Sequence, residues 1–433
     1  MKKANFALRS VSAVCAMVLL CTACSNGSWE TVQLSEYVDV PVSQNPIDSS
    51  IADTPSDVSS DTYISSDTTA NFPSNDSPSY TVDVPGLDAK EEYLSAAEYG
   101  INNPFLVYVT KSNNSTYCCT EEEFLPSVAY MENGVIKDTM FDTFVFLPDV
   151  NFLYDYGPDD GGKAPLQKSD WQGYIRNHEF AKGYNMDALD AAVGKVKSAL
   201  NLSDYKVNVI MPILYPVKSV TNFGSVNGSK LNFSKVEDRK EGVKWFVDEQ
   251  IETFERKKYE NIKVVGFYWF VEAMPLIDVE TKNIAKYITE YVKSLNLTTL
   301  WIPYFKAAGY DKWKETGFDL VAMQPNFFPS SDAPNCGGEE RLKQTADLAK
   351  KYNMGVEIEV ERANEISVTH LKKYYRAGIE YGYMDAFHTF YMNQGPSVFY
   401  EFYNSADSYL HSAYTDTYKF IKKTLKINEL LIK

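Results

Sequence analysis

Histidine and cysteine are scarce in this chain of 433 residues, which contains four histidines and six cysteines. The cysteines are Cys15, Cys21, Cys24, Cys118, Cys119 and Cys336. Three of them lie in the N-terminal segment. The other three permit one disulfide, from Cys336 to Cys118 or Cys119, but their odd number leaves a spare thiol and does not indicate a disulfide scaffold. The cysteines and histidines also lack the spacing of a zinc site. We therefore expect neither a metal site nor a cofactor.

Positive charge is in deficit as well. The net charge is −16, and residues 30–89 contain eleven acids but no Lys or Arg, while residues 90–433 contain 39 bases and 47 acids. A nucleic-acid-binding protein or a binder of anionic membrane surfaces is therefore disfavoured. No glycine-rich phosphate fingerprint opens any expected helix, so nucleotide binding also lacks support.

The apolar run near the N-terminus, residues 11–20, is too short to span a bilayer, and it follows Lys2, Lys3 and Arg9. This pattern is typical of a signal peptide. A small residue directly before Cys24 resembles the bacterial lipobox, with Cys24 as the lipidated new N-terminus. Ordinary secretory cleavage is the alternative. We expect residues 1–24 to be a lipoprotein signal peptide and the mature protein to be lipid-anchored in the bacterial cell envelope, facing outward.

Residues 25–88 are rich in Ser, Asp, Thr and Pro and have no apolar periodicity. Such a segment cannot bury enough apolar surface to offset the entropy of ordering it. We expect a disordered tether here, followed by one folded domain over residues 89–433.

Eight short runs in that domain are rich in β-branched and aromatic residues. They are residues 105–110, 141–147, 207–214, 262–270, 298–305, 318–324, 355–361 and 384–391. Most are apolar on both faces, as parallel strands covered by helices require. Amphipathic stretches separate them, at 121–131, 186–200, 236–258, 282–295, 339–352 and 368–381, with a short one near 310–315 and a last one at 407–425. This alternation predicts a (β/α)8 barrel with long βα loops.

Barrel enzymes carry their reacting groups at the C-terminal ends of the strands. The fourth run ends in Tyr268-Trp269-Phe270-Val271-Glu272, and the seventh carries Glu357, Glu359 and Glu361 on one face. Glycoside hydrolysis needs such a pair of carboxyl groups, one to protonate the leaving oxygen and one to attack the anomeric carbon or activate water. We assign Glu272 as acid/base and Glu359 as nucleophile, with Glu357 and Glu361 as alternatives. The structural alternative for Glu272 is a solvated loop carboxylate. For the three glutamates of the seventh run it is an ion-pair network.

Polar and aromatic residues gather near the same strand ends. The candidates for substrate binding are Asp149, Trp171, Tyr268, Trp269, Trp301, Tyr304, Gln324, Asn326, His388 and Tyr391. Taken singly, each aromatic is more often a core residue and each polar group a loop hydrogen-bonding group. Their concentration at one end of a barrel is typical of a cleft that binds a glycan.

Several strings resemble the bacterial family catalogued as a domain of unknown function, DUF4855. They are FDTFVFL at 141–147, SDWQGYI at 169–175, GFYWFVE at 266–272, residues 300–328, Arg341-Leu342 and GVEIEVE at 355–361. The resemblance covers nearly everything after residue 100 and implies a barrel like that of glycoside hydrolases, without an assigned substrate. Phe327 stands where the family often has Tyr, and Glu361 where it often has Asp.

The sequence thus predicts a monomeric surface lipoprotein whose barrel binds and hydrolyses a carbohydrate by a retaining two-carboxylate mechanism. A non-catalytic glycan-binding lipoprotein is the alternative. A hydrolase or isomerase that holds a hard cation by carboxylates is a third class, disfavoured by the few histidines.

Cys24→Ser should abolish lipid anchoring and leave the barrel folded, because the tether separates the lipidation site from the folded domain. Fractionation of cells that express each version measures the anchoring. Recovery of the Ser variant in the membrane fraction would contradict the lipoprotein assignment.

Overall fold

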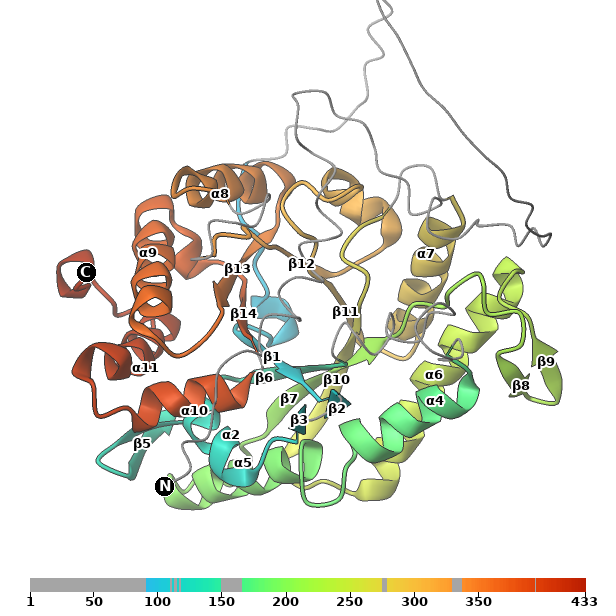
Figure 1. Ribbon diagram of the computed structural model, residues 1–433, viewed down its shortest axis with the longest axis horizontal. Helices are drawn as coiled ribbons and strands as arrows, with labels where there is room; N and C mark the ends of the chain where they lie inside the picture. Colours follow the sequence, from blue (N-terminus) through green and yellow to red (C-terminus); the bar gives the residue numbers. More distant parts are fainter. Residues whose placement is uncertain are drawn as a thin grey trace, which may run out of the picture. The chain divides into compact units, whose positions relative to one another are not determined.

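Eight parallel strands close into a barrel (Figure 1). They are β1 Pro104–Tyr108, β6 Thr143–Leu147, β7 Val207–Ile213, β10 Ile262–Trp269, β11 Thr298–Trp301, β12 Leu320–Met323, β13 Gly355–Val360 and β14 His388–Met392. Neighbouring strands follow the order β1-β14-β13-β12-β11-β10-β7-β6, and β6 pairs with β1 to close the ring. All eight predicted strands are confirmed, and with them the (β/α)8 barrel.

The computed structural model describes residues 91–109, 111–112, 115–116, 118–148, 166–274, 279–328, 337–393 and 395–433. The predicted signal peptide, the predicted tether, Cys24 and Asp149 lie outside these residues. None of the described helices has the length and hydropathy needed to cross a membrane.

The strands are buried on both faces, which explains their unbroken apolar sequences. Every residue of β6, β7, β12 and β13 is buried. Side chains on one face of each strand fill the barrel, and those on the other pack beneath the surrounding helices. Burial of apolar surface on both faces contributes roughly 25 cal/mol per Å² removed from water.

Helices surround the barrel (Figure 1). The α-helices are α2 Glu121–Val128, α4 Lys168–Tyr174, α5 Met186–Ala199, α6 Val236–Lys257, α7 Val279–Ser294, α8 Glu340–Tyr352, α9 Glu365–Tyr381, α10 Pro396–Asn404 and α11 Ser408–Ile421. Short helices are η2 Ala97–Tyr99, η4 Tyr310–Thr316, η5 Tyr383–Asp385 and η6 Ile427–Glu429, and η3 Ile175–Glu179 is a π-helix. The sequence analysis missed α4 and α10, and it extended the first helix past Val128, where the chain enters a strand.

The described residues also form three small hairpins outside the barrel sheet, and none of them was predicted. They are β2 Lys111–Ser112 with β3 Ser115–Thr116, β4 Ala129–Glu132 with β5 Val135–Thr139, and β8 Gly224–Val226 with β9 Ser229–Leu231. Asn133-Gly134 and Asn227-Gly228 form two of the turns, with positive φ at both residues of each pair. Positive φ at both positions is the requirement of a type I′ hairpin turn, so Asn-Gly was the sequence signal for these two hairpins.

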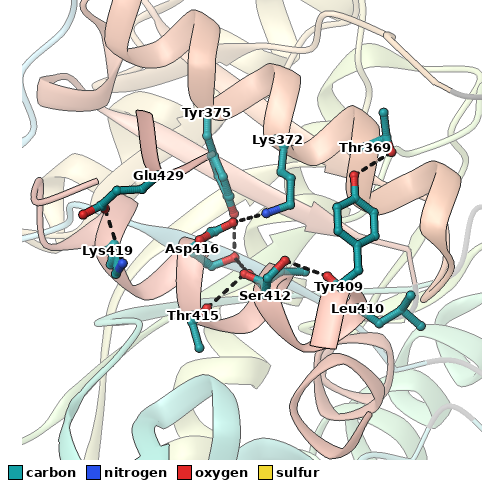
Figure 2. Close-up of polar contacts among 12 residues, drawn as sticks. Thr369, Lys372, Tyr375, Tyr409, Leu410, Ser412, Thr415, Asp416, Lys419 and Glu429 are labelled. Atoms are coloured by element: carbon teal, nitrogen blue, oxygen red, sulfur yellow. Dashed lines mark hydrogen bonds and ion pairs between the residues drawn. The ribbon is translucent and has the colours of Figure 1, made fainter. Parts of the chain in front are cut away.

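A buried polar network joins α9 to α11 (Figure 2). Lys372 and Asp416 form an ion pair in which both side chains are almost fully buried. Thr369 and Tyr409 share a hydrogen bond of 2.7 Å beside it. Loss of one partner from such a pair leaves an uncompensated buried charge, so the pair fixes how the two helices dock.

Gly266 shows how closely β10 and β11 pack. A β-carbon at this position would lie 2.3 Å from the backbone carbonyl oxygen of Thr298 on the neighbouring strand. Because a backbone atom cannot rotate away, the two strands would have to separate. We expect Gly266→Ala to lower the free energy of unfolding by about 1–3 kcal/mol, measured by denaturant unfolding.

Gly173→Ala is the matched control for this substitution. Gly173 lies in α4, and a β-carbon there would meet its nearest heavy atom, on Asn177, at 3.9 Å. Alanine is favoured over glycine in a helix, so the free energy of unfolding should stay the same or rise. A Gly266→Ala protein as stable as the control would contradict the close packing of these strands.

Candidate active site

A hollow lies at the C-terminal ends of the barrel strands. It has an empty volume of about 270 Å³, which includes the part open to solvent. The residues that line it are Leu106, Tyr108, Tyr268, Glu272, Gln324, Phe328, Glu357, Glu359 and Tyr391. These come from β1, β10, β13 and β14 or directly follow β10 and β12. The strands therefore bring three of the predicted carboxyl groups, Glu272, Glu357 and Glu359, into one hollow.

Glu272 follows the end of β10 and is half-buried. Burial raises the pKa of this carboxyl group to about 7, and a hydrogen bond from the Gln324 side chain opposes that shift. Gln324 also donates from Nε2 to the carbonyl oxygen of Ile302 at 3.0 Å, which orients the amide. A carboxyl group with a pKa near 7 retains its proton at neutral pH more readily than a solvated one, as a general acid requires.

Glu359 lies on β13 and is 3% exposed. The Tyr374 hydroxyl donates to Glu359 Oε2 at 2.6 Å, and the backbone amides of Asn326 and Phe327 also donate to this carboxylate. Burial raises the pKa of Glu359 to about 7, while these three hydrogen bonds oppose the rise. They stabilise the ionised form, which is the form that a nucleophile needs.

Asn326 thus contacts Glu359 through its backbone amide. Its φ is 52°, in the left-handed region. Its side-chain Oδ1 accepts a hydrogen bond of 3.2 Å from the backbone amide of Phe305. This turn directs two successive amides at Glu359, an arrangement that suits an anion.

Glu357 lies two residues before Glu359 on the same face of β13, and it is 2% exposed. Thr389 donates from Oγ1 to Glu357 Oε1 at 3.1 Å. Burial raises the pKa of Glu357 well above its ordinary value, and the negative charges of Glu359 and Glu272 raise it further. Both effects favour the protonated form of Glu357.

Three tyrosines complete the wall of the hollow. Tyr268 and Tyr391 were predicted, whereas Tyr108, the last residue of β1, was not, although its place at a strand end was the available signal. The rings of Tyr108 and Tyr391 meet edge to face, with centroids 5.9 Å apart. Burial raises the pKa of all three phenols. Neutral phenols beside carboxyl groups suit hydrogen bonding to sugar hydroxyls.

Three tryptophans predicted to contact substrate are core residues instead. Trp171 is 1% exposed and packs against Phe223, Phe233 and Phe246. Trp301 stacks on Phe318 and donates from Nε1 to the carbonyl oxygen of Val271 at 2.8 Å. Trp269 meets Tyr215 edge to face. Trp269 and Trp301 fail as predictions because side chains alternate along a strand, so the neighbour of an inward residue points outward.

His388 also lies away from the hollow. It is the first residue of β14 and pairs in register with Val356, whereas Tyr391 pairs with Glu359. Its Nδ1 lies 3.0 Å from the carbonyl oxygen of Ala386, and burial lowers the pKa of the ring to about 4. The predicted run, 384–391, begins before the observed strand β14. His388 therefore lies at the opposite end of β14 from the hollow.

Two further candidates do not line the hollow. Tyr304 is half-buried in the loop after β11. Glu361 is 6% exposed, and its carboxylate lies 3.8 Å from Nη2 of Arg362. Within the described part of the chain, no group of three or more His, Cys, Asp or Glu side chains is placed to hold a metal ion.

Solved structures with a similar fold have low sequence identity. An endo-beta-1,4-mannanase from Thermotoga petrophila is 14% identical with a TM-score of 0.42, over 77% of this chain and 78% of that chain. A GH30 endoxylanase from Clostridium papyrosolvens C71 is 10% identical with a TM-score of 0.34, over 74% and 72%. A fungal beta-1,4-galactanase is 11% identical with a TM-score of 0.33, over 70% and 87%. At this identity the likeness concerns the barrel fold alone.

No curated protein matches the chain. A family match covers the barrel from β1 to α11, over residues 103–419, and its description is "Domain of unknown function (DUF4855)". The resemblance noted from the sequence strings is thereby confirmed, and the chain belongs to the DUF4855 family.

Proposed function

We propose that this protein is a glycoside hydrolase that uses Glu272 as acid/base and Glu359 as nucleophile. The observation that carries the proposal is that both carboxyl groups line one hollow but have different hydrogen-bond partners. Glu272 receives a hydrogen bond from one amide side chain, while Glu359 receives three hydrogen bonds. Two carboxyl groups with separate roles are the requirement of glycoside hydrolysis.

In the first step, Glu359 attacks the anomeric carbon while Glu272 gives its proton to the departing glycosidic oxygen. In the second step, Glu272 takes a proton from water, and the resulting nucleophile releases the sugar from Glu359. The configuration at the anomeric carbon is then retained. Tyr108, Tyr268 and Tyr391 would contact the sugar and exclude water from the reacting atoms.

A glycan-binding protein without turnover is the second candidate, since a tyrosine-lined hollow serves binding as well as catalysis. In either case we propose that the protein is a monomer in the bacterial cell envelope, with the barrel held outward by a lipid on Cys24 and a tether over residues 25–88. Cys24 and the tether lie outside the described residues, so this part rests on the sequence.

Substitution of each carboxyl group separates the two roles. Glu272→Gln should lower turnover of natural glycosides by about 10²–10⁴-fold but far less for the first step with an activated aryl glycoside, whose leaving group needs little protonation. Glu359→Gln should stop turnover of both substrates, because no leaving group replaces the nucleophile. Hydrolysis rates after a screen of glycans, with the product anomer followed by NMR, measure both effects.

Glu361→Gln is the matched control, a buried glutamate near the same strand that does not line the hollow. It should retain wild-type turnover. If the wild type binds a glycan tightly yet releases no product, and the Glu272 and Glu359 variants change affinity alone, the protein is the binder and the catalytic assignment is wrong.

The pH profile gives a further prediction. Because Glu272 must be protonated to act as an acid, kcat/KM for a natural glycoside should fall as the pH rises through about 7, the pKa to which burial raises this group. The same descending limb should be weak or missing with an activated aryl glycoside. A profile that is flat between pH 6 and 9 for both substrates would show that Glu272 is not the acid.

A further inference from the structure

Helix α9 makes polar contacts on two sides. Towards the barrel, the buried Tyr374 side chain donates from its hydroxyl to Glu359 Oε2 at 2.6 Å. Towards α11, Thr369, Lys372 and Tyr375 each have a polar partner. These three residues are spaced by three positions, so they lie on one stripe of the helix. The same helix therefore contacts the candidate active site and a neighbouring helix.

The contacts between α9 and α11 are buried and directional (Figure 2). Lys372 pairs with Asp416, and the hydroxyls of Tyr375 and Thr417 lie 2.5 Å apart, with all four side chains buried. Hydrogen bonds weaken steeply with distance and angle, so such contacts fix one helix against another more tightly than apolar packing does. The α9–α11 network consists of Thr369, Lys372, Tyr375, Tyr409, Asp416 and Thr417.

Helix α9 also contacts the turn after β12, which supplies the other donors to Glu359. The ring of Phe327 packs against the rings of His370 and Tyr374, with centroids 4.6 and 5.7 Å apart. The backbone nitrogen of Phe327 lies 3.4 Å from the Tyr374 hydroxyl. A shift of α9 would therefore disturb the phenol donor and also the turn whose amides donate to the same carboxylate.

The surroundings of Glu359 make it sensitive to these donors. It faces Glu357 on its own strand, Glu272 after β10, Tyr391 on β14, Tyr374 on α9 and the amides of the turn after β12. None of the described residues that line the hollow is Lys, Arg or His. Neutral hydrogen-bond donors are therefore what opposes the effect of burial on this carboxyl group.

We propose that Tyr374 is a positioning residue for Glu359, and that the α9–α11 network holds Tyr374 in place. The hydroxyl orients the carboxylate and stabilises its ionised form. The Lys372–Asp416 pair, on another side of the helix, fixes the position from which the hydroxyl donates. Because Glu359 is the proposed nucleophile, the proposal rests on the proposed function. It assigns an influence on this group to residues that do not line the hollow.

The pKa of Glu359 in the protein without substrate tests the role of Tyr374. NMR follows the side-chain carboxyl carbons of ¹³C-labelled glutamate through a pH titration, and the Glu359→Gln spectrum identifies the Glu359 signal by its absence. Tyr374→Phe removes a donor to the ionised form, so the pKa of Glu359 should rise. The expected rise is about 1–2, the worth of one hydrogen bond to a charged group.

Replacement of the buried ion pair tests the α9–α11 network. Lys372→Met combined with Asp416→Leu removes both charges, so that no uncompensated charge stays buried. The double variant should raise the pKa of Glu359 by no more than Tyr374→Phe does, because it weakens the hydrogen bond without removing the donor. In the Tyr374→Phe protein the same double variant should have no further effect, since the network acts through that hydroxyl.

Tyr375→Phe combined with Thr417→Val gives the same test without a change in charge, and it replaces the ion-pair variant if that variant does not fold. It removes both hydroxyls of a pair, so neither is left buried without a partner. Tyr418→Phe is the matched control. Tyr418 also lies on α11, but its hydroxyl donates to Asp138 at 2.8 Å and not to α9, so the pKa of Glu359 should stay unchanged.

The outcomes separate the positioning role from the proposed function. An unchanged pKa of Glu359 in Tyr374→Phe would overturn the role of Tyr374. Network variants that leave the pKa unchanged, or that raise it equally with and without the Tyr374 hydroxyl, would overturn the role of the network. Where a glycan is hydrolysed, the ascending limb of kcat/KM should move to higher pH with the pKa of the nucleophile. Lack of turnover of every glycan would contradict the proposed function alone, because the titration uses no substrate.

Discussion

Burial of three carboxyl groups at one end of the barrel is the constraint on which this site depends. An ionised carboxylate that is removed from water without a counter-charge loses several kcal/mol of solvation, so such a group either binds a proton or finds hydrogen-bond donors. Burial favours the protonated form of Glu357, whereas Glu359 accepts hydrogen bonds from nearby donors. The barrel tolerates this loss because its strands are buried on both faces, and the apolar surface that they remove from water supplies the compensating free energy.

The alternation of β13 places the carboxyl groups. Its sequence Gly-Val-Glu-Ile-Glu-Val sends the aliphatic side chains to one face and both glutamates to the face that lines the hollow. The parallel register with β14 then sets Thr389 beside Glu357 and Tyr391 beside Glu359. A shift of one residue in the strand register would turn the glutamates towards the helices, an unfavourable environment for charged side chains. The pattern that sets the register of β13 therefore also places both glutamates in the hollow.

The barrel could be predicted from the sequence because strands that are buried on both faces have short apolar runs, and amphipathic stretches of helical length separate these runs along the chain. Part of the site followed from the same runs, since Glu272, Glu359 and Gln324 lie at their ends. The predictions failed where strand bounds and side-chain direction decide the outcome. Trp301 points outward, and His388 is the first residue of its strand, whereas the predicted run 384–391 has it in the interior. No sequence pattern indicated a role for Tyr374. It lies on α9, 15 residues after Glu359, and reaches this carboxylate only in the folded structure.

Hydrogen bonds, and not burial, separate the roles of the three glutamates. Burial raises the pKa of all of them, so on that ground alone they would titrate together. Tyr374 and two backbone amides favour the ionised form of Glu359, and the charge that results disfavours ionisation of Glu357 on the same strand. Because the charge of Glu359 raises the pKa of Glu357, the two carboxyl groups of β13 do not titrate independently. The donors that favour the carboxylate form of Glu359 lie outside β13, on α9 and in the turn after β12, so the state of this group depends on how these elements pack around the strand.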